Sequence, residues 1–243
     1  MNPVLLIPAR MASARLPGKP LADIGGVSMI ARVWAQAMAA GLGPVVVAAG
    51  DREIVDEIEK AGGRAVLTDP DLPSGSDRIW AALAIIDPQG AHDVVVNLQG
   101  DLPALDPEQL KIVVSALAQS GADIATLAAP IDNDDDKTNP AVVKAVVAWD
   151  AEERLGRALY FTRAMAPGGD GTLYHHVGLY AYRRAALARF VALPPSPLEQ
   201  REKLEQLRAL EAGMSIAVAR VDAAPLSVDT PADLEKARTV LSL

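Results

Sequence analysis

Cysteine is absent from the 243 residues, which excludes disulfides, thiolate zinc sites, iron–sulfur clusters and cysteine nucleophiles. Histidine is scarce as well, and the three residues His92, His175 and His176 argue against a histidine-rich metal cage. Lysine and arginine total 23 against 31 aspartates and glutamates. The resulting net charge of −8 argues against a nucleic acid or an anionic membrane as partner.

Long hydrophobic runs are also missing. The apolar run after Met1-Asn2-Pro3 covers only residues 4–7, whereas the core of a signal peptide needs roughly 7–15 residues. No run approaches the ~18–20 apolar residues that a membrane-spanning helix needs. We therefore expect a soluble, cytoplasmic protein.

Short β-branched segments alternate with helical patterns in the first half of the chain. This alternation predicts an α/β fold with a mostly parallel central sheet flanked by helices. The expected strands are Val4–Ile7, Val45–Ala49, Arg64–Leu67 and Val94–Leu98, and the expected helices follow Ser28, follow Asp51, cover Asp77–Ile86 and run from Pro107 to Gln119. Ligands of such sheets bind at the carboxyl ends of the strands, so residues 1–120 are predicted to form a nucleotide-binding half.

The second half has a different rhythm, typical of a mixed-sheet extension. Four strand-like segments follow one another without a long helix between them: Ile124–Ala128, Val142–Trp149, Ala158–Phe161 and Tyr174–Tyr182. Helices are expected at Arg184–Ala192 and Leu198–Ala212, a strand at Ser215–Val221 and a last helix from Thr230-Pro231. The acidic run 132–136 is predicted to be a solvated loop, because a calcium loop needs spaced ligands and a glycine turn. Length alone leaves one or two domains open.

A basic loop follows the first expected strand. Residues 8–20 read PARMASARLPGKP and contain Arg10, Arg15 and Lys19, whereas the first acidic residue is Asp23. Arginine forks and a lysine at the carboxyl end of a buried strand match phosphate oxygens, so the loop predicts a phosphate site. The alternative is a solvated basic loop. The P-loop pattern and the GxGxxG dinucleotide pattern are both absent.

Two aspartates are candidate magnesium ligands. Asp101 follows a strand through Gln99-Gly100, and Asp229 precedes Thr230-Pro231. Both come just beyond strand-like runs, so a parallel sheet could bring them to one edge beside a polyphosphate. The alternatives are that Asp101 caps a turn and that Asp229 helps to cap the last helix, although Thr230, Pro231 and Asp233 already account for that cap.

Seven motifs together resemble the 3-deoxy-manno-octulosonate (KDO) cytidylyltransferase family. They are PARMASARLPGKPL (8–21), SGSDR (74–78), NLQGD (97–101), YFTRA (160–164), HHVGLYAYR (175–183), PPSPLEQREKLEQLR (194–208) and VDTPADLE (228–235). The resemblance implies a single nucleotidyltransferase domain, with residues 1–120 binding the nucleotide and residues 121–243 binding the sugar and forming a homodimer. It also implies the transfer of CMP from CTP to the acidic sugar KDO with magnesium, giving CMP-KDO and pyrophosphate for lipopolysaccharide synthesis.

The same resemblance implies roles for individual residues. Catalysis is expected from Lys19, Arg10, Asp101 and Asp229, with Asp101 and Asp229 holding Mg²⁺. CTP is expected to contact Pro8, Ala9, Arg10, Ser13, Arg15, Lys19, Ser74, Arg78 and Gln99. The sugar is expected to contact Arg163, His176, Tyr180, Glu205 and Gln206.

Several of these residues have a structural alternative. His175 and His176 face opposite sides of one strand, so at most one of them points into a site, and we favour His176. Glu205 and Gln206 could belong to a solvated helix face on which Glu199 pairs with Lys203. The aromatic residues between 160 and 182 could wall the sugar pocket or form dimer contacts.

Departures from the family pattern keep other functions open. Leu102 stands where the family has an acid in QGDEP, and Gly50 also replaces a carboxylate. A related acidic sugar, such as 8-amino-KDO or a sialic acid, is therefore the alternative substrate. A catalytically silent nucleotide-sugar-binding protein or a regulatory subunit is the alternative from another class, whereas an NAD-dependent reductase would need the missing glycine pattern.

Overall fold

The computed structural model describes residues 1–13 and 15–241. The chain divides into two compact units. The first consists of Met1–Lys111 together with the segment from Pro225 to the C-terminus, and the second consists of Ile112–Ala224. The C-terminal segment, which we expected in the second half, thus belongs with the first unit.

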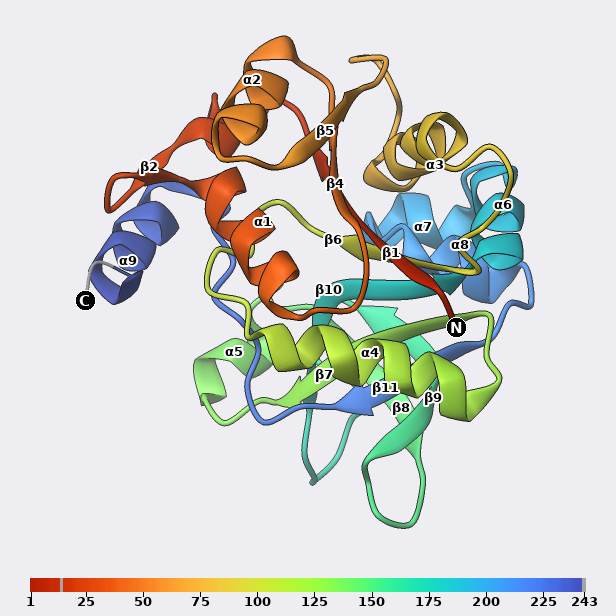
Figure 1. Ribbon diagram of the computed structural model, residues 1–243. Coiled ribbons are helices and arrows are strands. Elements are labelled where there is room, and N and C mark those ends of the chain that lie inside the picture. Colours follow the sequence, from red (N-terminus) through yellow and green to blue (C-terminus); the bar gives the residue numbers. More distant parts are fainter. Residues whose placement is uncertain (14, 242–243) are drawn as a thin grey trace. The chain divides into compact units, whose positions relative to one another are not determined.

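The first unit is built on four parallel strands. β1 (Pro3–Ala9), β4 (Val45–Ala49), β5 (Arg64–Leu67) and β6 (Val94–Leu98) lie in the order β5-β4-β1-β6. Helices α1 (Met29–Ala39) and α2 (Arg52–Lys60) lie on one side of these strands, and α3 (Gly75–Ile86) lies on the other (Figure 1). The chain adds β4 and β5 on one side of β1 and then returns to add β6 on the other side. Because each crossover is right-handed, this reversal places α3 on the face opposite to α1 and α2. The carboxyl ends of β1 and β6 therefore meet at one edge.

Local sequence explains where these elements begin and end. β4 and β6 are buried along their whole length, as their apolar runs predict. Ser28 caps α1 by accepting a hydrogen bond from Ala31 N at 3.4 Å, and the chain leaves this helix through Gly41 at φ 64°. α4 (Pro107–Ser120) starts at Pro107, as expected of proline in a first helical turn.

The C-terminal helix α9 (Pro231–Leu241) packs beside a small ribbon formed by β2 (Asp23–Ile24) and β3 (Val27–Ser28). A short 3-10 helix, η1 (Lys19–Leu21), precedes that ribbon. The side chains that close this part of the unit are buried together; they are Ile24, Met29, Val228, Leu234 and Ala237. Because Leu16 of the basic loop packs against the same cluster, α9 is anchored beside that loop.

The second unit contains a mixed sheet. Its strands are β7 (Ile124–Pro130), β8 (Lys144–Trp149), β9 (Leu155–Thr162), β10 (Tyr174–Arg183) and β11 (Ile216–Arg220), in the order β10-β7-β11-β9-β8. Among the described strand pairs within this unit, β7–β11 is parallel and the others are antiparallel. A further bridge between His175 and Lys144 joins β10 to β8. The predicted α/β class, with parallel strands flanked by helices and a mixed extension, is confirmed.

Helices of the second unit correct two expectations. The acidic run is not a loop throughout, because Asn133 caps the short helix α5 (Asp134–Thr138). After α6 (Arg184–Val191), the helix expected at Leu198–Ala212 is two helices, α7 (Pro197–Glu202) and α8 (Gln206–Glu211). The break lies at Lys203, whose φ of 56° ends α7. No glycine or proline marks this break in the sequence, because residues 198–212 contain neither.

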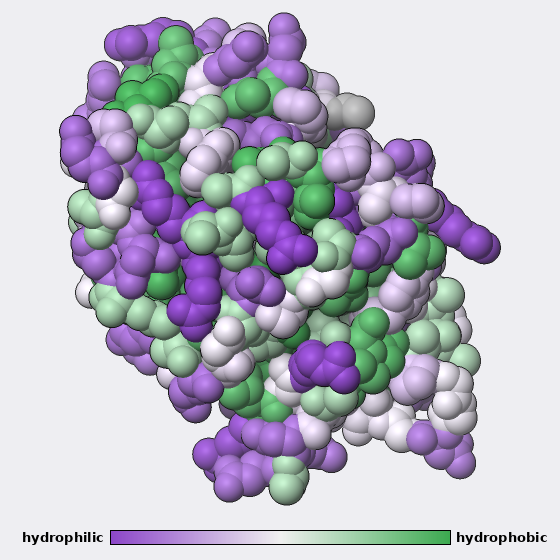
Figure 2. Space-filling view, turned by 90° about the vertical axis from the view of Figure 1, so that its right-hand side faces the viewer, coloured by the Kyte–Doolittle hydropathy of each residue, from purple (hydrophilic) through white to green (hydrophobic). Residues whose placement is uncertain are grey.

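The surface is of mixed character. Hydrophilic and hydrophobic residues are interspersed on the face drawn in Figure 2, as is usual for folded proteins. Within residues 1–13 and 15–241, no helix combines the length and hydrophobicity needed to cross a membrane.

Candidate active site

The basic loop leaves the carboxyl end of β1 and is fixed at both ends. Met11 N donates a hydrogen bond to Asp51 Oδ2 at 2.7 Å, and Gly18 N donates to Met11 O at 3.2 Å. Gly18 has φ 69°, a conformation that glycine adopts without strain. Asp51 is the N-cap residue of α2, yet its side chain makes no cap bond, so its carboxylate anchors the loop instead.

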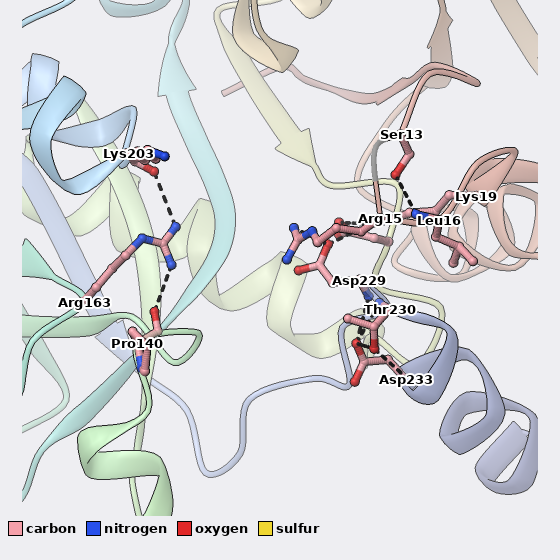
Figure 3. A network of polar contacts seen from close by, with 11 residues as sticks. Ser13, Arg15, Leu16, Lys19, Pro140, Arg163, Lys203, Asp229, Thr230 and Asp233 are labelled. Carbon is pink, nitrogen blue, oxygen red and sulfur yellow. Dashed lines mark hydrogen bonds and ion pairs between the residues drawn. The ribbon is translucent and has the colours of Figure 1, made fainter.

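The basic loop brings its cations to both candidate metal ligands. Lys19 Nζ lies 2.8 Å from Asp101 Oδ2 and 3.0 Å from Asp229 Oδ1. Arg15 approaches the same Asp229 oxygen at 3.1 Å (Figure 3). Lys19 is the most enclosed of the four, with a side-chain exposure of 15%, whereas Arg15 is 66% exposed. The two carboxylates and two cations balance in charge.

Backbone contacts explain how the two aspartates meet. Asp101 follows β6 through Gly100, where a Cβ would lie 3.1 Å from Pro8 O, so glycine permits this close approach. Val228 N donates to Asp101 O at 3.0 Å, which sets Asp229 beside Asp101. We expected both aspartates to follow strands of a parallel sheet. That reason was wrong for Asp229, because β11 ends at Arg220 and an irregular segment precedes Asp229.

The cap of α9 does not use the Asp229 side chain. Asp233 Oδ2 accepts hydrogen bonds from Thr230 N at 2.9 Å and from Thr230 Oγ1 at 2.7 Å, and Asp233 N donates to Thr230 Oγ1 at 3.3 Å. Figure 3 shows Thr230 and Asp233 together at the start of the helix. The Asp229 carboxylate instead accepts from Lys19 and Arg15.

A cavity of about 410 Å³ opens at this edge of the first unit. This volume lies within the range of small-molecule sites. Its lining residues are Pro8, Ala9, Arg10, Ala12, Ser13, Arg15, Lys19, Pro20, Leu72, Ser74, Gly75, Arg78, Gln99, Gly100, Asp101 and Asp229. Every residue that we expected to contact CTP or magnesium lies on this lining, although most are far apart in the sequence.

Two of these lining residues also have structural contacts. Arg78 is 2% exposed and donates to Thr68 Oγ1 at 2.7 Å, Asp69 O at 2.9 Å and Pro70 O at 3.1 Å. Burial, and then the neighbouring Arg10 charge, lower the pKa of Arg78. Ser74 caps α3, accepting from Asp77 N at 3.1 Å.

The departures at Gly50 and Leu102 have simple packing explanations. A Cβ at Gly50 would lie 2.8 Å from Arg78 Nη1 and 3.2 Å from Arg10 Cβ, so a side chain there would require the Arg78 guanidinium to shift. Leu102 is 5% exposed and is not among the residues that line the cavity. Neither Gly50 nor Leu102 is among the residues that line the cavity, so neither departure changes the charge of the lining.

His176 is the more enclosed of the two strand histidines, at 7% exposure. Thr126 Oγ1 lies 3.0 Å from His176 Nε2, 3.0 Å from Val177 O and 2.8 Å from Leu179 O. When the Thr126 hydroxyl donates its proton to one of these carbonyls, its oxygen can accept a hydrogen bond from the Nε2–H tautomer of His176. Burial lowers the pKa of His176 to about 3, so the imidazole is neutral.

Aromatic rings continue from His176 along β10. Ring centroids are 4.7 Å apart for Phe161 and His176, and 5.5 Å apart for His176 and Tyr180. The register of β10 shifts between Val177 and Tyr180, where two residues of β10 have no counterpart in β7. Burial raises the pKa of Tyr180 well above its ordinary value, with further contributions from Tyr182 and Glu205.

Glu205 and Gln206 come at the start of α8 rather than within a continuous helix. Gln206 is 6% exposed, and its Nε2 has no hydrogen-bond partner among the described residues. The alternative in which Glu199 pairs with Lys203 was wrong, because Glu199 binds Arg208 at 2.5 and 2.8 Å. A solvated face therefore does not describe Gln206, which is enclosed.

Arg163 follows β9 and contacts main-chain carbonyls. Its Nε donates to Glu202 O at 2.9 Å, Nη1 donates to Pro140 O at 2.9 Å, and Nη2 lies 3.5 Å from Lys203 O. Figure 3 shows the guanidinium between Pro140 and Lys203. Glu202 in turn accepts from Arg163 N at 3.0 Å and from Thr162 Oγ1 at 2.8 Å. Arg163 thus ties the α7–α8 turn to the segment before β8.

Three residues with supporting contacts were missed by the sequence analysis: Asp51, Thr126 and Glu202. Each acts on a partner at least 40 positions away in the chain. No local pattern distinguishes them, although Asp51 was noticed as a helix cap. Among the described residues, no group of three or more histidine and acidic side chains is placed to hold a metal ion.

Comparison with known proteins agrees with these observations. The family model for cytidylyltransferases matches residues 4–216. A 3-deoxy-manno-octulosonate cytidylyltransferase from Parvibaculum lavamentivorans is 66% identical over 99% of this chain and 93% of its own length. One from Rhodospirillum centenum is 63% identical over the same shares of the two chains.

Solved structures show the same relationship. A CMP:2-keto-3-deoxy-manno-octonic acid synthetase complexed with CTP superimposes with a TM-score of 0.91, at 37% identity, over 100% of this chain and 99% of the other. The 4-diphosphocytidyl-2C-methyl-D-erythritol synthase of Anaerococcus prevotii shares the fold alone, at TM-score 0.66 and 14% identity. The basic loop, the paired aspartates and these matches together place the chain in the 3-deoxy-manno-octulosonate cytidylyltransferase family.

Proposed function

We propose that this chain transfers CMP from CTP to 3-deoxy-manno-octulosonate, releasing pyrophosphate, and so supplies CMP-KDO for lipopolysaccharide synthesis. The observation that carries the proposal is the cavity of the first unit. It gathers Arg10, Arg15 and Lys19 beside Asp101 and Asp229, at the carboxyl ends of parallel strands. Three cations suit a triphosphate, and two carboxylates suit a metal ion that the triphosphate shares.

Positioning and charge neutralisation account for the chemistry. The anomeric hydroxyl of the sugar attacks the α-phosphorus in line; a new P–O bond forms as the bond to the β-phosphate oxygen breaks, and the hydroxyl proton is released. Arg10, Arg15 and Lys19 hold the phosphates and stabilise the negative charge that accumulates on the leaving pyrophosphate. Ser13, Ser74, Arg78 and Gln99 are proposed to position the nucleotide.

Magnesium fits the donor set of this site. Asp101 and Asp229 would hold it, since hard carboxylate oxygens combined with phosphate oxygens are the usual ligands of Mg²⁺ next to a nucleotide. When bound, Mg²⁺ supplies charge neutralisation for the reacting phosphates.

The acidic sugar is proposed to bind at the polar side chains of the second unit. His176, Tyr180, Glu205 and Gln206 offer hydrogen-bonding groups for its hydroxyls and carboxylate, and the buried Nε2 of Gln206 is a donor that still needs an acceptor. Arg163 belongs to this set through the resemblance, and its contacts with carbonyls support a role in holding the α7–α8 turn.

Pyrophosphate release tests the proposal directly. The purified chain is incubated with Mg²⁺, KDO and each of CTP, UTP, ATP and GTP, and then with CTP and a panel of acidic sugars. We expect turnover with CTP and KDO. Preference for a purine nucleotide would overturn the assignment, preference for 8-amino-KDO or a sialic acid would change the sugar, and binding without turnover would indicate a silent nucleotide-sugar-binding protein.

The resemblance also supports a homodimer and a cytoplasmic location, the compartment that supplies CTP. Light scattering on the purified chain tests the first, because a dimer doubles the mass of the 25.5 kDa protomer. Cell fractionation tests the second.

A further inference from the structure

The ammonium group of Lys19 stands where a divalent cation would have to bind. Its Nζ lies within 3.0 Å of one oxygen from each carboxylate, Asp101 Oδ2 and Asp229 Oδ1. It is also the only lysine among the residues that line the cavity. The pair of aspartates therefore already has a cation between its members.

A metal ion and this ammonium cannot share the same oxygens. Mg²⁺ requires carboxylate oxygens at about 2.0–2.1 Å, and an ammonium group held at hydrogen-bond distance from the same atoms would repel it strongly. Lys19 is largely enclosed, with 15% side-chain exposure, so water screens that repulsion poorly. For a metal ion to bind, Lys19 must first find another anion.

The local structure allows the side chain to move while its backbone stays fixed. Lys19 N donates to Leu16 O at 3.1 Å, and the neighbouring Gly18 is bonded to Met11 O. Beyond this fixed backbone, the four-carbon stem of lysine can redirect its charge, which the planar fork of an arginine does less readily. Phosphate oxygens in the same cavity would be the new partner.

We propose that Lys19 determines the binding order of the site: it excludes divalent cations from Asp101 and Asp229 until a nucleoside triphosphate draws its ammonium away. This inference rests on the proposed function for the identity of the anion. Thermodynamic linkage then requires that the triphosphate raise the affinity for the metal ion and that the metal ion raise the affinity for the triphosphate equally. The exclusion of metal ions in the absence of nucleotide does not depend on the identity of the anion, because it follows from the contacts of Lys19 with the two aspartates.

Manganese binding to the purified chain tests this without any turnover. Free Mn²⁺ is measured by electron paramagnetic resonance during titration, with and without a non-hydrolysable CTP analogue. We expect weak binding to the wild type alone and much tighter binding with the analogue. Lys19→Met should bind Mn²⁺ roughly tenfold more tightly than the wild type in the absence of nucleotide, because a neutral side chain of similar length no longer repels the ion.

Matched variants separate the role of Lys19 from a general loss of charge. Lys60→Met removes an exposed lysine at the end of α2 and should leave Mn²⁺ binding unchanged. Lys19→Arg keeps the charge and should behave as the wild type in the absence of nucleotide. Adding Asp101→Asn to Lys19→Met should remove the gain, and Lys19→Gln provides a second neutral variant if Lys19→Met folds poorly.

Three results would overturn the inference. They are equal Mn²⁺ affinity in the wild type and both neutral variants, wild-type affinity that does not depend on the nucleotide analogue, and a gain that survives Asp101→Asn. Absence of pyrophosphate release in the separate turnover assay would instead contradict the proposed function. The two failures are distinguishable because Mn²⁺ binding is read without substrate turnover.

Discussion

Asp101 and Asp229 have the same side chain and nearly the same surroundings, but the chain holds them in different ways. Asp101 is carried by the end of a buried strand, and Asp229 by an irregular segment that is bonded to Asp101 through Val228 N. Lys19 joins both carboxylates. At the residue scale, the site therefore depends on a few charges whose removal should change chemistry more than stability.

Replacing either carboxylate should separate these effects. We expect Asp101→Asn and Asp229→Asn each to lose most magnesium-dependent turnover, because an amide is a poor ligand for Mg²⁺. Each melting temperature should stay close to that of the wild type. Turnover and thermal melting of the same preparations check this.

Thr230→Ala is the matched control for Asp229→Asn. Thr230 forms the cap of α9 with Asp233, so its loss should destabilise the protein by about 1 kcal/mol while leaving the magnesium dependence unchanged. If Asp229→Asn lowered the melting temperature and retained wild-type magnesium dependence, Asp229 would stabilise α9 and would not bind the metal ion.

At the scale of elements, the second unit has two irregularities, one in β10 and one between α7 and α8, and each leaves main-chain carbonyls available to side chains. The register shift in β10 frees carbonyls that Thr126 binds, and the left-handed Lys203 separates α7 from α8. His176 contacts Thr126 next to the register shift, and Arg163 binds the carbonyls of the α7–α8 turn. Substitution of His176 should therefore change the stability of β10, and substitution of Arg163 should change that of the α7–α8 turn.

Acid stability should report the burial of His176. The folded imidazole has a pKa of about 3 against an ordinary 6.5, so below pH 6.5 the unfolded chain takes up a proton that the folded chain does not. Stability should fall as the pH drops from about 6.5 towards 3, by up to about 1.4 kcal/mol per pH unit from this group. Urea unfolding across this range should show a shallower dependence for His176→Gln. An unchanged slope would mean that His176 is protonated in the fold.

Arg163→Lys should affect the sugar more than the nucleotide. A lysine cannot reach all three carbonyls with one ammonium, so the turn before Glu205 and Gln206 loosens and stability falls by about 1 kcal/mol. We expect the KM for KDO to rise while the KM for CTP stays constant. Arg157→Lys, at an exposed position of β9, the strand that precedes Arg163, is the control. Equal changes in both KM values would argue against this role of the turn.

At the scale of the whole molecule, each unit is held by its own core, and the last segment of the chain completes the first core rather than the second. Leu234 and Ala237 of α9 pack with Ile24 and Met29, close in sequence to Lys19. The C-terminal helix thus stabilises the part of the first unit from which the basic loop reaches Asp229.

Leu234→Ala tests this contribution. The cavity it leaves should lower the free energy of unfolding by roughly 2–5 kcal/mol, whereas Lys236→Ala on the exposed side of the same helix should change it little. Denaturant unfolding of both variants measures the difference. Equal stabilities would indicate that α9 is peripheral to the core of the first unit.

The sequence by itself determined the parallel strands, the helices between them and the cationic character of the loop. These features depend on local patterns, because the period of hydrophobic residues and the capping residues act within a few positions. The family motifs also identified the residues that line the cavity, since they are read directly from residue order.

Tertiary structure alone decided which of these groups touch. The contact of Lys19 with both aspartates depends on a backbone hydrogen bond from Val228 N to Asp101 O. The hydrogen bonds of Arg163 to main-chain carbonyls depend on the turn at Lys203. The roles of Asp51, Thr126 and Glu202 likewise require partners from distant segments. No local pattern records such contacts, because their geometry is set only when the folded backbone brings those segments together.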